Sequence, residues 1–460
     1  MKFVLVQFVV VGQLLIAGCS SNRDGLRILE ELRRDGLIID DGGEVAPAHM
    51  TNDDGVVLPN GKITLVALLA AADRLNPRIA AARAQVGEMG GRAWQAGFYP
   101  NPSLEVESEN IEFSGGGFGE SETTVRVSQP IIISGRRDAA MAAGDAKLSA
   151  ARWELERVRR EVHGRIRREI AEIAYFRQAI SLHEELRVLA GRTLDVARTR
   201  FEARASPESE AIRAAVEVNN LELNIDRLRG DMNAGGERLA ALLGGWRIDM
   251  DRIAGTAIES KSIGVLPELE QLAASVRTAH PAVLAAEAGV EAAVHQVDIE
   301  RAQRHADIAA RFGVGVNHAD DEGFIEAGVG IPLSILDQNR GGILAARFGV
   351  IRAQQEAEAT RAELAGALGA AYRRWESATL RLGVFEMQIL VGAQRAFEQA
   401  SAGYEAGKLP FLDVLDAQRT LIEARLALIE LRRSVSITRA EMYEILGEQI
   451  NPENQQGDTL

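Results

Sequence analysis

The chain has 460 residues and a formal net charge of −14, with 26% charged and 5% aromatic residues. The acidic balance argues against nucleic acid as a partner, because contacts with phosphates need a basic surface. The low aromatic content, together with abundant Ala, Glu, Arg and Leu, is typical of long helices rather than of a thick globular core.

The first element in chain order is an export signal. Residues 1–18 begin with Lys2, continue with an apolar run and end in small residues, which is the pattern of a signal peptide. Residues 15–19, Leu-Ile-Ala-Gly-Cys, are similar to the bacterial lipobox, in which cleavage precedes a cysteine that is then acylated, for example with palmitate. Cys19 is the sole cysteine, so we expect it to carry a lipid anchor; an ordinary signal peptide with a chance cysteine is the alternative.

Residues 19–63 are rich in Asp, Gly and Asn, and we expect a mostly extended segment there. From residue 64 onward the chain repeats itself at about 203 residues, which predicts an internal duplication. The first repeat covers 64–244, an inter-repeat or equatorial segment 245–266, the second repeat 267–447, and a tail 448–460. The paired landmarks are Asn76-Pro77 and His280-Pro281, Gln129-Pro130 and Ile331-Pro332, Gly135-Arg136 and Asn339-Arg340, Phe201-Glu202-Ala203 and Tyr404-Glu405-Ala406, and Leu243-Gly244 and Leu446-Gly447.

Each repeat is predicted to contain a helix, two strands, a long helix, a sharp turn and a returning helix. Apolar residues recur every three or four positions over 137–202, which predicts an amphipathic helix of about 100 Å at 1.5 Å per residue. Its counterpart is expected over 341–405. Antiparallel partners are expected over 208–243 and 411–446.

Four segments alternate between apolar and polar or glycine residues with a period of two. They cover 104–109, 123–128, 308–316 and 324–331, and the alternation is typical of transmembrane barrel strands. Four strands cannot close a barrel, and open sheet edges are not tolerated in lipid. The chain must therefore pool strands with copies of itself, which gives eight strands from two copies or twelve from three.

These features together resemble the TolC-like outer membrane factor family over about residues 64–447. The most specific motifs are Tyr404-Glu405-Ala406-Gly407 and, after the turn, Asp413-Val414-Leu415-Asp416-Ala417-Gln418. The resemblance implies a trimer, with a twelve-stranded β-barrel in the outer membrane and a long antiparallel α-helical barrel, a coiled-coil tunnel. It also implies a periplasmic adaptor (membrane fusion) protein and an inner-membrane RND-type pump as partners, and outer-membrane lipid around the strands. The motifs at 129–137 and 331–341 look like those of the cobalt–zinc–cadmium efflux branch.

The resemblance also assigns site residues. Asp413 and Asp416 match acidic rings at the pore constriction, and Glu210 and Tyr404 match a pair that holds the gate closed. The family's gate uses an Arg near Leu409, which this chain lacks, and the first turn has Arg204 where the family has Gly. Adaptor-docking residues are expected in both turns: Arg204, Ala205, Ser206, Gly407, Lys408, Leu409 and Pro410.

No motif in the sequence supports catalysis, a cofactor or a tight metal site. The seven His residues are scattered, and neither HExxH nor a phosphate-binding glycine loop occurs. The resemblance implies a passive exit duct in the outer membrane for divalent heavy-metal cations. Two alternatives remain, a duct for drugs or organic solutes and a lipid-anchored structural coiled coil without a pore.

Overall fold

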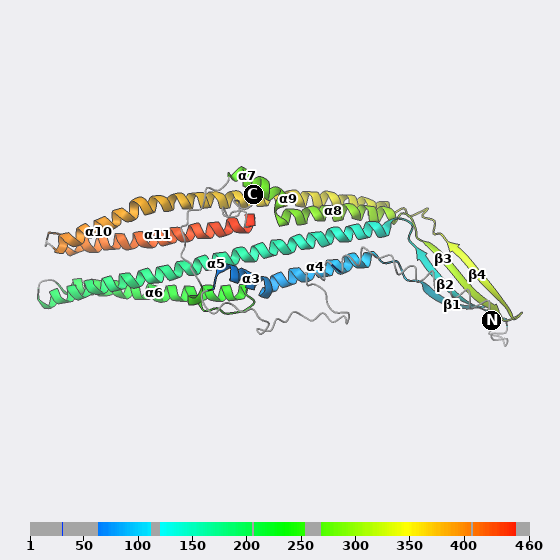
Figure 1. Cartoon of the computed structure of the whole chain (residues 1–460), viewed down its shortest axis with the longest axis horizontal. Coiled ribbons are helices and arrows are strands. Elements are labelled where there is room, and N and C mark those ends of the chain that lie inside the picture. The colour runs from blue at the N-terminus through cyan, green and yellow to red at the C-terminus, as the bar shows by residue number, and fades with distance from the viewer. Residues whose placement is uncertain are drawn as a thin grey trace, which may run out of the picture. The chain divides into compact units, whose positions relative to one another are not determined.

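The computed structural model describes residue 30 and residues 63–111, 120–204, 207–253, 268–405 and 408–447. The predicted plan of helix, two strands, long helix, turn and helix occurs twice in this part of the chain (Figure 1). No described helix has an apolar stretch long enough to span a bilayer. The first repeat consists of α3 (Leu65–Leu75), α4 (Pro77–Ala96), β1 (Ser103–Glu109), β2 (Glu122–Ile131), α5 (Arg136–Glu202) and α6 (Glu208–Leu242); the second consists of α7 (Leu269–Ala279), α8 (Pro281–Ala302), β3 (Ile308–Asn317), β4 (Glu322–Gly330), α9 (Arg340–Val384), the π-helix η3 (Phe385–Ile389), α10 (Leu390–Glu405) and α11 (Phe411–Leu446).

The described residues form two compact units, and each unit draws on both repeats. The first contains Ala81–Leu155 and Pro281–Thr360, and therefore all four strands. The second contains Glu156–His280 and Arg361–Leu460, with α3 before them, and therefore both helix reversals. The units do not coincide with the repeats because α5 and α9 each run through both of them.

The four strands form one antiparallel sheet in the order β1-β2-β3-β4. The two hairpins join through β2 and β3, where Val125 pairs with Val314. Alternation puts the apolar side chains on one face and the polar ones on the other, as the sequence predicts. On the polar face Arg126 contacts Glu326 at 2.9 Å and Glu107 at 3.2 Å. The strand bounds differ from the prediction by up to three residues: β2 extends to Ile131 instead of ending at residue 128, and Ile331 lies just beyond β4.

In the second unit the buried stripe of α5 packs against both helices that follow the reversals. One cluster joins Leu182, Leu186 and Ala190 of α5 to Leu221 of α6 and Ile429 of α11. The apolar spacing that predicted the helix is thus the spacing of its packing contacts.

Ion pairs also join α5 to α11. Arg433 donates to both carboxylate oxygens of Glu172, at 2.7 and 2.8 Å. Nearer the start of α5, Arg168 lies 2.8 Å from Glu444. Two parallel hydrogen bonds between a guanidinium and a carboxylate fix orientation better than a single contact does. The helix pair α5–α6 and the helix pair α10–α11 are therefore fixed to each other through contacts between α5 and α11.

The long helix predicted over 341–405 is divided in the structure. The π-helix Phe385–Ile389 separates α9 from α10, whereas α5 runs for 67 residues without interruption. Glu386, within the π-helix, accepts hydrogen bonds from Arg432 of α11 at 2.7 and 3.1 Å. The wider turn lies where this side chain reaches its partner on the returning helix.

The first helix pair of each repeat is interrupted before a proline. Asn76 precedes Pro77, is 3% exposed, and accepts hydrogen bonds from the amides of Arg78 and Ile79 at 2.9 and 3.3 Å. This is the N-cap of α4, with proline at the first helical position where no amide is needed. In the second repeat His280 occupies the equivalent position before Pro281 and is 6% exposed.

Candidate functional site

Both helix reversals lie in the second unit, and the returning helices begin in the same way. Pro207 precedes α6 and Pro410 precedes α11, both with extended backbone angles. The carbonyl of Pro207 accepts from the amide of Glu210, and that of Pro410 from the amide of Asp413, each at 3.1 Å. Proline suits this place because it fixes φ and the helix needs no amide there. Glu210 and Asp413 are therefore structurally equivalent positions.

The first reversal ends α5 with a residue of positive φ. Arg204 has φ 55°, and its amide donates to the carbonyl of Phe201 at 2.9 Å. Glycine is the usual residue in this left-handed conformation, because an L side chain costs about 1–2 kcal/mol there. The sequence has Arg204 at a position where the family has glycine, and this residue adopts the left-handed conformation that glycine favours.

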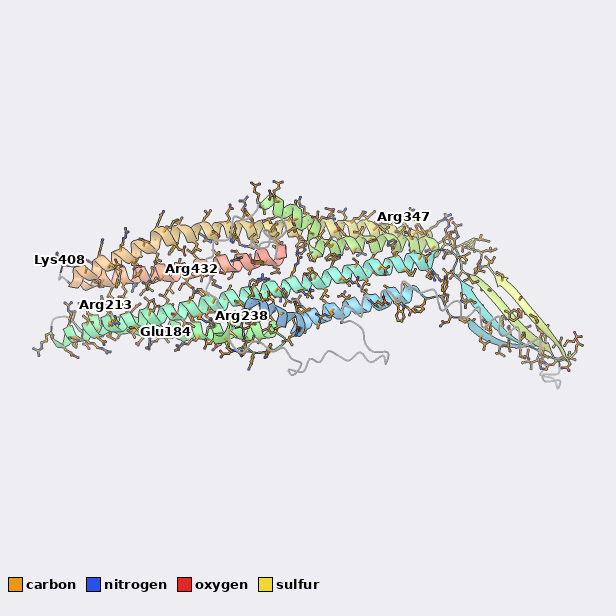
Figure 2. The ribbon with its side chains drawn as sticks, in the orientation of Figure 1. Glu184, Arg213, Arg238, Arg347, Lys408 and Arg432 are labelled. Atoms are coloured by element: carbon orange, nitrogen blue, oxygen red, sulfur yellow. The ribbon has the colours of Figure 1, made fainter. Side chains whose placement is uncertain are left out.

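The second reversal brings Leu409 back onto the end of α10. The amides of Lys408 and Leu409 donate to the carbonyl of Gly403 at 2.8 and 3.2 Å. A Cβ added to Gly403 would lie 2.6 Å from Cδ1 of Leu409, so any larger residue here would force the side chain of Leu409 to move. Gly403 is a site residue that sequence reasoning missed. Figure 2 shows Lys408 at this end of the hairpin.

The two predicted aspartates are exposed on the first two turns of α11. Asp413 and Asp416 are three residues apart, so they project from nearby directions on the helix. Neither forms an ion pair with any side chain in the described part of the chain. In the first repeat the equivalent residues are Glu210, which is half-buried, and the exposed Arg213 near the start of α6 (Figure 2). Two carboxylates three residues apart at these positions thus occur in the second repeat, whereas the first repeat has one carboxylate and one cation.

Several predicted site residues fall outside the described residues. They are Cys19 with its signal peptide, Ala205 and Ser206 of the first turn, and Gly407 of the second. Tyr404 lies on α10, and its side chain is outside the description, so its predicted pairing with Glu210 remains a prediction. The described site therefore consists of Arg204, Glu210, Lys408, Leu409, Pro410, Asp413 and Asp416.

Chemically, the described site offers carboxylates and cations at two helix reversals. Exposed carboxylates without a cationic partner attract and concentrate passing cations. Among the described residues, no three His, Cys, Asp or Glu side chains come together as a metal-binding group.

Comparisons with known proteins agree with this architecture. The family model described as outer membrane efflux protein matches residues 68–245 and 272–448. The cobalt-zinc-cadmium resistance protein CzcC of Cupriavidus metallidurans is 28% identical over 367 residues, covering 80% of this chain and 85% of that protein. The nickel-cobalt-cadmium resistance protein NccC of Alcaligenes xylosoxydans xylosoxydans is 28% identical over 300 residues, covering 64% of this chain and 66% of that protein.

The fold is similar to that of solved outer membrane proteins. The crystal structure of the outer membrane protein VceC from Vibrio cholerae matches with a TM-score of 0.66 at 20% identity, covering 83% of this chain and 96% of that one. At this identity the match concerns the fold. It is the fold that the period-two segments and the long amphipathic helices predict.

Proposed function

Because the chain belongs to the outer membrane efflux protein family, we propose that it is the exit duct for divalent heavy-metal cations. It is an outer-membrane channel component that works as a homotrimer with a periplasmic adaptor and an inner-membrane pump, as the resemblance implied. The metal cargo is the proposed step. It is supported by the relatives CzcC and NccC, whose names describe metal resistance, and by the carboxylates at the second helix reversal.

The observation that carries the proposal is the exposure of Asp413 and Asp416 on one side of α11 without cationic partners. In a trimer these two residues would supply two rings of three carboxylates. Such rings favour cations over anions in a narrow pore, and they release their ions readily because each ion meets several weak sites rather than one tight site.

The turns around this site are proposed to dock the adaptor. The first turn comprises Arg204, Ala205 and Ser206, and the second comprises residues 407–410 with Lys408 at its exposed end. Glu210 and Tyr404 are proposed to hold the closed gate. Leu409 packs on Gly403 where the family has an Arg, so the closed state would depend on packing as well as on charge.

The remaining parts of the proposal concern the anchor and the chemistry. Cys19 is proposed to carry the lipid that anchors the mature N-terminus. One acyl chain gives only marginal membrane binding, so the anchor would supplement the strands rather than replace them. The chain is proposed to act without catalysis, since the pump supplies the energy for transport.

The test is complementation of a deletion strain. The wild-type protein should restore growth in Co, Zn or Cd salts, and the double variant Asp413→Asn with Asp416→Asn should restore it only in part. Glu423→Gln is the matched control, because Glu423 is an exposed acid farther along α11. A deletion strain that is sensitive to organic solutes and not to metals would refute the metal cargo and support the drug duct.

Bilayer recordings separate the two rings from general surface charge. Purified wild-type trimers should prefer cations and show reduced monovalent conductance in millimolar divalent cation. The double variant should lose most of both effects, whereas Glu423→Gln should keep them. Equal selectivity in all three proteins would mean that Asp413 and Asp416 do not line the constriction.

A further inference from the structure

The loop after β4, residues 331–339 (the β4 loop), carries an apolar run that its own chain leaves uncovered. Leu333, Ile335 and Leu336 are 75%, 71% and 99% exposed, although they lie close together in sequence. The polar end of the loop is held in place, because the amide of Asn339 donates to a backbone carbonyl near the end of α8 at 3.0 Å. The three apolar side chains therefore project from a loop that is anchored at its far end.

The β4 loop leaves the sheet at an open edge. β1 and β4 are the outer strands, and neither has a second neighbouring strand within the described part of the chain (Figure 1). Ser103, at the start of β1, pairs with Ser128 of β2, and Ser128 pairs with Arg311 of β3. Arg311 in turn pairs with Gly328 near the end of β4. The start of β1 and the end of β4 therefore lie at the same end of the sheet.

The segment before β1 is also apolar and only partly covered. Phe98 and Tyr99 are 43% and 47% exposed. Trp94 lies edge-on to Phe98, with 5.2 Å between the ring centroids, and the guanidinium of Arg137 lies 4.2 Å from the centre of the Tyr99 ring. These contacts within the chain fix the two rings and leave the rest of their surface exposed. This end of the sheet thus presents an exposed apolar group beside each outer strand.

The symmetry of the homotrimer brings these two groups together. Identical copies that close head to tail into a ring join two different patches, one from each side of the subunit, so β4 of one copy meets β1 of the next. The four strands alternate in direction, and the alternation continues across this boundary, so the new pair is antiparallel. The end of β4 then lies beside the start of β1, and the β4 loop lies beside the chain that leads into β1 of the next copy.

We propose that the β4 loop is a clasp between copies, in which Leu333, Ile335 and Leu336 pack on Phe98 and Tyr99 of the partner subunit. The removal of apolar surface from water drives this contact, which needs no charged partner. Because the loop is anchored at one end and the rings are held by neighbours, little freedom is lost on docking. The clasp rests on the homotrimer of the family and uses no residue of the helix reversals, so it is independent of the metal cargo.

Disulfide trapping tests the contact. Leu336→Cys is combined in turn with a cysteine at each of positions 98–102, because closing a sheet staggers its strands and a scan covers the stagger. A disulfide needs Cα atoms about 4.4–6.8 Å apart, so oxidation of the purified trimer should link at least one of these pairs into covalent dimers and trimers. Each single variant, which keeps Cys19, should run as a monomer on denaturing gels.

The matched control is Asp320→Cys, an exposed position in the turn at the opposite end of the sheet. It should form no link with a cysteine at any position from 98 to 102. If Leu336→Cys also forms no link with any of them, the proposal is overturned. Light scattering reports the trimer of each variant separately, so failure of the clasp is distinguishable from failure of the channel assembly.

A spin label on Ile335→Cys separates a contact between copies from a contact with lipid. In trimers reconstituted into phosphatidylcholine vesicles, a label packed between copies should be protected from oxygen, which collects in lipid, and from a water-soluble nickel chelate. Val329→Cys, at a residue that is 68% exposed on the apolar face of β4, is the lipid control, and Asp320→Cys is the water control. Relaxation of the label by oxygen to the extent seen at Val329→Cys would place the loop in the membrane. Relaxation by nickel would mean that nothing covers it, and either result overturns the proposal.

Discussion

His280 is expected to make the stability of the protein depend on pH. It lies before α8 and is 6% exposed, and burial lowers its pKa from 6.5 to about 4, with Arg160 and Arg157 adding to the effect. The folded chain therefore holds this imidazole neutral at a pH where an exposed histidine would be charged.

The sign follows from comparing the two states. Between pH 6.5 and about 4 the unfolded chain binds a proton at His280 and the folded chain does not, so stability falls as the pH falls through this window. Above pH 6.5 and below about pH 4, the contribution of His280 to the free energy of unfolding does not change with pH. The difference between 6.5 and about 4 corresponds to about 3 kcal/mol per chain, and the part already lost at pH 5 is about 2 kcal/mol.

The perturbation is His280→Asn, which restores the residue of the first repeat. Asn76 caps α4 from the equivalent buried position, so asparagine is compatible with this backbone. Denaturant unfolding of the purified trimer at pH 8 and at pH 5 measures the effect. The wild type should lose about 2 kcal/mol per chain more than the variant between these pH values. His305→Asn, at an exposed position, should behave like the wild type.

Equal losses in the wild type and in His280→Asn would refute the reasoning. They would mean that His280 titrates near its ordinary pKa despite its burial. Loss of the trimer in the variant at pH 8 would show that the imidazole is needed for packing rather than for its charge state.

Three further predictions concern close packing, ion pairing and backbone strain. Gly144→Ala places a Cβ 2.8 Å from the α4 backbone and should destabilise by about 1–3 kcal/mol, whereas Gly91→Ala, with nothing within 4 Å, should stabilise by up to about 1 kcal/mol in thermal unfolding. Arg433→Lys should lose about 1–2 kcal/mol because a lysine cannot form both hydrogen bonds with Glu172, and Glu172→Gln should add little to that loss in a double-mutant cycle. Arg204→Gly should stabilise the first turn by about 1 kcal/mol, measured as hydrogen exchange at the end of α5, and an unchanged rate would mean that φ 55° costs nothing here.

The elements with regular periodicity could be predicted from the sequence. The alternation over 308–316 predicted β3 because a strand with one polar face and one apolar face shows it directly. The 67 residues of α5 were predicted almost to the residue, since its buried stripe recurs at helical spacing. The family resemblance, carried by motifs, is confirmed by the match to the outer membrane efflux protein model.

The π-helix could not be predicted in the same way. Residues 385–389, Phe-Glu-Met-Gln-Ile, contain neither proline nor glycine, so no local signal interrupts the helical pattern. What marks the wider turn is a tertiary contact, the hydrogen bond between Glu386 and Arg432 of another helix, which the local sequence does not reveal. Gly403 was missed for a related reason, since its contact with Leu409 depends on the direction of the chain after α10 ends.

The two repeats also indicate which aspartate tests the proposed pore more cleanly. Glu210 and Asp413 occupy the same position in the first turn of their helices, where any acidic residue stabilises the positive end of the helix dipole. That effect falls off within one turn, so it does not account for Asp416. The first repeat has Arg213 there, so helix stability does not require an acid at this position.

Asp416→Asn should therefore reduce cation selectivity in bilayer recordings without changing the melting temperature. Asp413→Asn should reduce selectivity and also destabilise α11 by about 0.3–1 kcal/mol. Glu210→Gln is the equivalent of Asp413→Asn in the first repeat. It should destabilise α6 by a similar amount and leave cation selectivity unchanged. If Asp416→Asn leaves selectivity unchanged while Asp413→Asn alters only the melting temperature, the acidic residues of α11 serve the helix and not the pore.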